Sequence, residues 1–91
     1  MNKTDLIDSV ASATGVSKID AAKAVDALLD TIAGSLQNGE EVRLTGFGSF
    51  SVAHRSARMG RNPRTGAQLH IAASNQPKFK AGKSLKSAVN N

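Results

Sequence analysis

Residues 53–75 constrain the fold more than any other part of the sequence, because they cannot bury themselves. Their only large apolar residues are Met59, Leu69 and Ile71. Between these lies Asn62-Pro63-Arg64-Thr65-Gly66, in which Pro fixes φ, the residue before it is pushed out of the helical region and Gly tolerates a positive φ. This pattern predicts a two-stranded ribbon, and strands of about nine residues would extend ~30 Å. A two-stranded ribbon alone is marginally stable, so we expect this segment, called the ribbon below, to protrude and to be held by a ligand.

Two segments before the ribbon have apolar residues at helical spacing. The first starts after Asn2, a candidate N-cap with Asp5 three positions later, and stops at Gly15. The second is about twenty residues long and runs from Ser17, another candidate cap, to the Asn38-Gly39 stop. Its apolar face spans about 140°, more than a two-helix seam requires, so we expect it to pack against more than one neighbour.

The hydrophobic period then changes from about 3.6 residues to 2. The alternating apolar positions are Val42, Leu44, Phe50 and Val52, and Gly46-Phe47-Gly48 lies between the two pairs. This pattern predicts a β-hairpin with one buried face.

After the ribbon, Phe79 marks the return of the chain to the body, and residues 82–89 predict a short last helix. The fold class is therefore α+β: two N-terminal helices, an antiparallel β-sheet with a long protruding ribbon, and a short C-terminal helix. We expect one domain over residues 1–91, with residues 1–52 and 76–91 as its body. A body this small is marginal without disulfides or a metal, and the chain has no Cys. We therefore expect a homodimer with a shared core.

Charge is divided sharply along the chain. Residues 1–41 carry three Lys and all seven acidic residues, whereas residues 42–91 carry nine basic residues and no acid. Such a segment cannot neutralise itself, which favours a polyanion as its partner, and nucleic acid is the commonest one. An ordinary basic protein with a solvated face is the alternative. We expect no membrane binding, because the basic half lacks a bulky apolar helix face.

Four arginines recur every three residues in the ribbon, at Arg55, Arg58, Arg61 and Arg64. Gly60 and Asn62-Pro63 exclude a helix of useful length, and on a strand Arg55 and Arg61 would face one side and Arg58 the other. A ribbon with cations on both faces suits a groove of duplex DNA, which has phosphates on both walls. Pro63, at the tip, either stabilises the turn or acts as a wedge between base pairs.

Enzymatic interpretations find no support in the pattern. His54 and His70 fall on opposite strands of the ribbon, about three positions out of register, so they do not converge. Without Cys there is neither a thiolate metal site nor a cysteine nucleophile, and we expect no enzymatic activity, no cofactor and no metal. The three Phe occupy core positions, which favours double-stranded over single-stranded nucleic acid.

The sequence resembles the bacterial histone-like HU proteins and their relatives, the integration host factor subunits. The resemblance covers the whole chain and is most specific at Gly46-Phe47-x-x-Phe50, followed by Arg55, Arg58, Gly60, Asn62-Pro63 and Thr65. Lys3, Phe79 and Gly82-Lys83 also fit. It implies an intertwined homodimer whose two ribbons embrace the minor groove, and a nonspecific, DNA-bending architectural protein of the bacterial nucleoid. The absence of the longer C-terminus of integration host factor subunits favours HU.

The resemblance also implies roles for particular residues. Pro63 would be the wedge, the four ribbon arginines would line the groove, Asn62 and Thr65 would shape the tip, and the flanking phosphates would be held by Lys3, Lys80, Lys83 and Lys86. Departures from the family pattern are Ala53, Ala67 and His70, where many relatives have basic residues; lower affinity and greater pH sensitivity are expected.

The expected partner is therefore double-stranded DNA, with a preference for bent, nicked or gapped duplexes. A heterodimer with a paralogue and binding to RNA remain open, as does a protein-binding module that uses the ribbon on an acidic partner. The polar N-terminus, Met1-Asn2-Lys3-Thr4-Asp5, does not resemble a secretory signal, so a cytoplasmic, nucleoid-associated location is expected.

Overall fold

A computed structural model describes all residues, 1–91, as two compact units, Met1–Gly34 and Ser35–Asn91. The order of elements is two helices, a β-hairpin, the ribbon, a last strand and a short helix. The sequence predicts all of these except the last strand. Each unit is described by itself below. No helix of the chain is both long enough and apolar enough to span a membrane.

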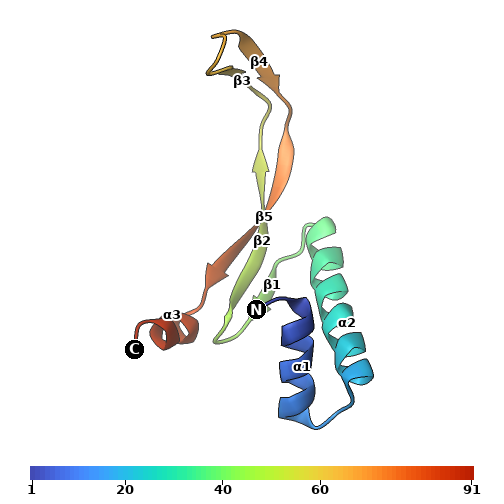
Figure 1. The fold of residues 1–91 in the computed structure, drawn as a ribbon. Coiled ribbons are helices and arrows are strands. Elements are labelled where there is room, and N and C mark those ends of the chain that lie inside the picture. Colours follow the sequence, from blue (N-terminus) through green and yellow to red (C-terminus); the bar gives the residue numbers. More distant parts are fainter. The chain divides into compact units, whose positions relative to one another are not determined.

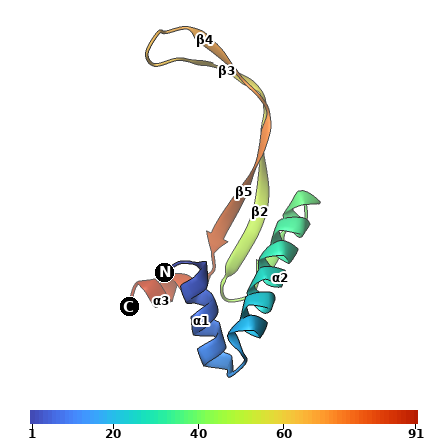
Figure 2. The same ribbon diagram turned by 45° about the vertical axis from the view of Figure 1, so that its right-hand side comes forward.

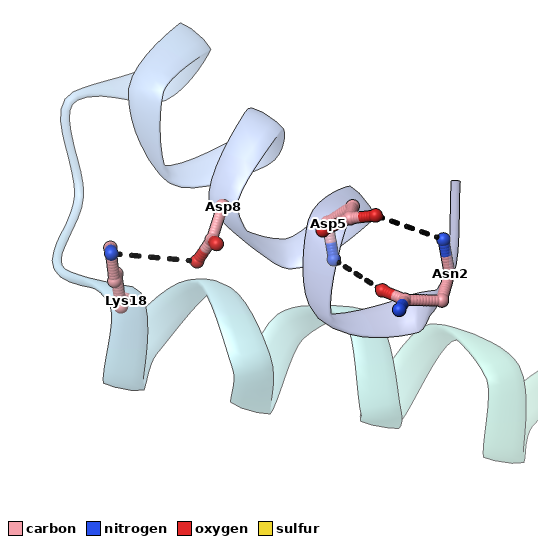
Figure 3. A network of polar contacts seen from close by, with 4 residues as sticks. All are labelled: Asn2, Asp5, Asp8 and Lys18. Carbon is pink, nitrogen blue, oxygen red and sulfur yellow. Dashed lines mark hydrogen bonds and ion pairs between the residues drawn. The ribbon is translucent and has the colours of Figure 1, made fainter.

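The first unit contains α1 (Lys3–Thr14) and most of α2 (Lys18–Gln37). Asn2 caps α1 through a capping box: its Oδ1 accepts the Asp5 N–H at 2.9 Å, and its own N–H donates to the Asp5 carboxylate at 3.3 Å (Figure 3). Gly15 ends the helix in the left-handed region, at φ 77°. These are the start and stop that the sequence predicts.

Small side chains hold α1 and α2 together, side by side in both views (Figures 1 and 2). The only buried hydrophobic residues of the chain are Ala11, Ala21 and Val25, all in these two helices. Several larger apolar side chains of the same unit stay exposed; Ile19 has 70% of its surface accessible and Leu28 has 54%. A single copy therefore buries little of its apolar surface.

The second unit is built on a three-stranded antiparallel sheet of β1 (Val42–Leu44), β2 (Gly48–Arg55) and β5 (Ser74–Ala81), with β2 in the centre. Gly46, at φ 85°, allows the turn between β1 and β2. Gly48 is buried where strands approach closely: a Cβ there would lie 2.6 Å from the Lys80 carbonyl oxygen and from the Phe79 ring. No larger residue fits this position.

Beyond this sheet the chain forms a second, two-stranded antiparallel sheet of β3 (Arg58–Arg61) and β4 (Gln68–Ile71). Ser56-Ala57 and Ala72-Ala73 lie between the two sheets and belong to no strand. Figures 1 and 2 show β3 and β4 continuing from β2 and β5, away from the end of the sheet that carries α3 (Lys83–Val89). The ribbon exists, although Arg55 and Ser74 at its base still pair in the three-stranded sheet.

The three phenylalanines form one cluster beside the β1–β2 turn. Phe79 lies between the other two, with ring centroids 4.9 Å from Phe50 and 5.7 Å from Phe47. Phe47 and Phe79 nonetheless keep 48% and 45% of their surface exposed. The sequence predicts these residues in a core, and one copy of the chain only half completes that core.

Candidate nucleic-acid interface

All four predicted arginines lie on the ribbon, and all are exposed. Arg55 ends β2, Arg58 and Arg61 begin and end β3, and Arg64 lies in the turn that follows. Arg58 and Arg61 are three residues apart on one strand, so they point to opposite faces. None of the four forms an ion pair, since the ion pairs of the chain all lie outside the ribbon. Their charges are available to a ligand on both faces.

The tip of the ribbon is organised around Asn62, which bonds to three later residues of the turn. Its side-chain Oδ1 accepts the Arg64 N–H at 2.8 Å, its carbonyl accepts the Gly66 N–H at 2.8 Å, and its own N–H donates to the Ala67 carbonyl at 2.9 Å. Thr65 adds one bond, as its Oγ1 accepts the Ala67 N–H at 3.2 Å. Pro63 is exposed within this closed loop.

Three predicted body cations gather in the second unit. Lys80 on β5 and Lys83 and Lys86 on α3 line a concavity of about 630 Å³, together with the β1–β2 turn. The Gly82 N–H donates to the Phe47 carbonyl at 2.7 Å and so fixes the start of α3 beside that turn. Arg43 lines the same concavity. No acidic residue lines it, so it is suited to an anion.

The sequence interpretation missed two cations, Arg43 and Lys78. The strand register puts Arg43 opposite Ser49, and Ser49 opposite Lys80, in one row across all three strands. Lys78 lies two residues from Lys80 and therefore on the same face. The alternation of Val42-Arg43-Leu44 and of Lys78-Phe79-Lys80 contains this signal, but only the register shows that the two strands present their cations together.

Lys3 is the one predicted site residue in the other unit. It forms an ion pair with Asp26 of α2. The hydrogen bond that the Lys3 ammonium donates to Asp26, together with the negative charges of Asp26 and Asp30, raises the pKa of Lys3 above its ordinary value of 10.5. Lys3 is thus charged at neutral pH and already has a partner.

The two histidines do not converge. His54 contacts the Asn75 side chain, with Nδ1 2.8 Å from Oδ1, while His70 lies opposite Met59, five residues along the chain from His54. The two histidines are therefore five positions out of register, and not about three as the sequence predicts. No group of three or more His, Cys, Asp and Glu side chains could hold a metal ion.

Comparison with known proteins identifies the family. Residues 1–90 match the model of the family described as bacterial DNA-binding protein. The chain belongs to this family. It is 58% identical to DNA-binding protein HRm of Rhizobium meliloti (strain 1021) over 90 residues, 99% of this chain and 100% of that protein. It is 57% identical to DNA-binding protein HU 1 of Bacillus subtilis (strain 168), covering 98% of this chain and 97% of that one.

Solved structures of the family share the fold. An Anabaena HU–DNA cocrystal structure matches at a TM-score of 0.90 and 43% identity, over 98% of this chain and 97% of that one. HU from Thermotoga maritima matches at 0.69 and 37% identity, over 98% of each chain. The expected α+β fold and the expected resemblance to HU are thereby confirmed. The family is one of DNA-binding proteins and not of enzymes.

Proposed function

We propose that this protein binds double-stranded DNA without sequence specificity and bends it, as an architectural protein of the bacterial nucleoid. The observation that carries the proposal is the ribbon: two strands with unpaired arginines on both faces and a closed turn that exposes Pro63. The similar Anabaena protein is an HU whose structure contains DNA, which supports the same ligand here.

Affinity would come from neutralising phosphates. The ribbon and the concavity contain eight of the nine basic residues of 42–91, in a segment without an acid: Arg43, Arg55, Arg58, Arg61, Arg64, Lys80, Lys83 and Lys86. Each phosphate contact releases a counterion, so each contact should add about −0.9 to the slope of log K against log [salt]. A duplex contacted mainly through its backbone is bound with little regard to base sequence.

Bending would come from the tip. Pro63 is rigid and apolar, and a residue of this kind between two base pairs unstacks them at a cost of a few kcal/mol. The extra backbone contact that a bend allows offsets this cost. Duplexes that are already bent, nicked or gapped avoid part of the cost, so they should bind more tightly.

The functional form would be a homodimer. Phe47, Phe79, Leu28 and Ile19 each keep 45% or more of their surface exposed in one copy, and the chain has no large side chain that is fully buried. A second copy would cover these apolar surfaces and complete a core that 91 residues alone do not build. Two copies would also supply two ribbons for one duplex.

The test combines solution mass with DNA titration. We expect a dimeric mass, a steep salt dependence on intact duplex, and tighter binding to a nicked duplex of the same sequence. Pro63→Ala should keep most of the affinity for intact duplex and lose the preference for the nicked one. Salt-independent binding would contradict phosphate neutralisation, and equal losses on both duplexes would leave Pro63 only a turn-forming role.

A further inference from the structure

The two-stranded sheet of β3 and β4 has two unlike faces. Directly opposite residues in an antiparallel pair share a face, as do residues two apart on one strand. The register of the two strands therefore places four residues on one face: Arg58, Gly60, Leu69 and Ile71. The other face, which we call the methionine face, carries the remaining four: Met59, Arg61, Gln68 and His70.

The apolar side chains of the two faces differ in what covers them. On the first face the Ile71 side chain lies over Gly60, where an added Cβ would come within 2.8 Å of the Ile71 Cδ1, and Ile71 is partly buried. Met59 is the only apolar residue on its own face, and it keeps 59% of its surface exposed. Met59 therefore adds little to the packing of the ribbon, and its thioether side chain is accessible to small reagents.

An accessible methionine can be oxidised reversibly. With hydrogen peroxide, a lone pair of the Met59 sulfur takes one oxygen atom as the O–O bond breaks. The other oxygen leaves as hydroxide and takes the proton of the transferred oxygen, so the products are the sulfoxide and water. The sulfur loses two electrons to the peroxide, and methionine sulfoxide reductases restore the thioether. The oxidised side chain is neutral, but it is polar and carries a hydrogen-bond acceptor oxygen.

The neighbours of Met59 on the methionine face are hydrogen-bond donors. Arg61 lies two residues along β3, about 6.8 Å away at the backbone, and His70 lies directly across the sheet, with Cβ atoms ~5 Å apart. The Arg61 guanidinium has five N–H donors and forms no ion pair, so no acid competes for it. Both Met59 and Arg61 are long and exposed, so a sulfoxide oxygen at Met59 can reach the guanidinium.

We propose that Met59 is a reversible oxidation site through which a peroxide weakens the contact of the ribbon with DNA. The sulfoxide oxygen accepts a hydrogen bond from Arg61 and draws this cation away from phosphate, while the net charge of the protein stays the same. This inference rests on the proposed DNA binding and adds a means of regulating it. The ribbon holds a duplex less tightly after oxidation and regains its hold when the sulfoxide is reduced.

The test compares titrations of the full-length protein onto one duplex before and after hydrogen peroxide, with peptide mass mapping to confirm one added oxygen on Met59. Oxidation should lower affinity about two- to fivefold, the value of one net hydrogen bond, for each ribbon that contacts the duplex. The slope of log K against log [salt] should become shallower by up to about 0.9 per ribbon. Treatment with a methionine sulfoxide reductase should restore both values.

Met59→Leu is the matched control, because it keeps a side chain of similar volume without the sulfur. It also keeps Met1, the only other methionine, which is 91% exposed and open to the same reagent. Its affinity should not change with peroxide. Arg61→Gln should lose most of the response, since the donor to the sulfoxide is gone. Thermal unfolding of each protein before and after treatment measures any loss of fold.

Four results would overturn the proposal. They are a protein with Met59 sulfoxide that binds duplex as tightly as the untreated one, an equal loss of affinity in Met59→Leu, a full response in Arg61→Gln, and a loss of affinity that accompanies unfolding. Untreated protein with no salt-dependent duplex binding would instead refute the proposed function itself.

Discussion

The first unit, Met1–Gly34, is called the helical unit here. It and the ribbon both carry basic residues, but these residues differ in what they already contact. Lys3 and Lys18 of the helical unit are paired with Asp26 and Asp8, the latter at 3.7 Å (Figure 3). The ribbon arginines form no ion pair, and no acidic residue follows Glu41 in the sequence. The number of basic residues in a region therefore does not show which of them can contact DNA. That depends on which basic residues already form an ion pair with an acidic residue.

The two regions also differ in what keeps them folded. The three-stranded sheet depends on close packing at Gly48, while the ribbon depends on strand pairing and on the hydrogen bonds of its turn. The body should therefore be sensitive to added volume, and the ribbon to changes of backbone and charge.

The largest effect is expected from Gly48→Ala. The new Cβ would lie 2.6 Å from the Lys80 carbonyl oxygen, which is backbone and cannot move without disturbing the sheet. We expect a loss of about 3 kcal/mol in the free energy of unfolding, measured by urea denaturation. Gly66→Ala is the comparison: Gly66 has φ 72° but open space around it, so its strain of about 1 kcal/mol should remain in the turn. Equal losses of unfolding free energy in the two variants would contradict the difference between a closely packed sheet and an open turn.

The second effect concerns affinity. Arg58→Gln combined with Arg61→Gln removes one cation from each face of β3 and should lower duplex affinity by about ten- to a hundredfold near 0.1 M salt for each ribbon that contacts the duplex. The slope of log K against log [salt] should fall by about 1.8 for each ribbon that contacts the duplex, and so by about 3.6 for the proposed homodimer. The unfolding free energy should hardly change, because neither side chain is buried. Retained affinity with an unchanged slope would show that the ribbon does not hold the phosphates.

The sequence predicted the elements well because their signals are local. The capping box at Asn2, the left-handed stop at Gly15 and the period-2 alternation around Gly46 each act within a few residues. The ribbon was predicted from the absence of a core together with the turn at Pro63. These features do not depend on distant parts of the chain.

The rest could not be predicted because it depends on register. That Arg43 and Lys78 share a face follows from two successive strand pairings, of β1 with β2 and of β2 with β5, and the second joins distant parts of the chain. That Lys3 is already paired depends on the packing of α1 against α2, which brings Asp26 to it. Sequence patterns give residue types at each position, but not which charges become neighbours.

The third prediction tests the tip. Asn62→Ala removes the oxygen that accepts the Arg64 N–H, so the loop around Pro63 should become less ordered. We expect a loss of about three- to fivefold in the preference for nicked over intact duplex, consistent with one net hydrogen bond. Asn62→Ser provides a shorter acceptor and should recover part of that preference. If Asn62→Ala reduced the preference equally in a Pro63→Ala background, Asn62 would not act through the proline.

The smallest effect comes from releasing a cation in the helical unit. Because Asp26 raises the pKa of Lys3, the ion pair is complete at neutral pH and is lost only as pH rises through that raised value, so removing Asp26 is the practical way to break it. Asp26→Asn should increase duplex affinity about two- to threefold and steepen the salt slope by up to about 0.9 per subunit, as Lys3 becomes free to contact a phosphate.

Asp8→Asn separates this release from a general change in charge. It also removes one acid and frees Lys18, which the family resemblance does not place among the phosphate contacts. Both variants raise the net charge by the same amount, so equal gains would mean that the field of the whole protein accounts for the effect. A gain with Asp26→Asn alone would show that the helical unit contains a DNA contact that is masked by its own aspartate, whereas the ribbon presents its contacts unmasked.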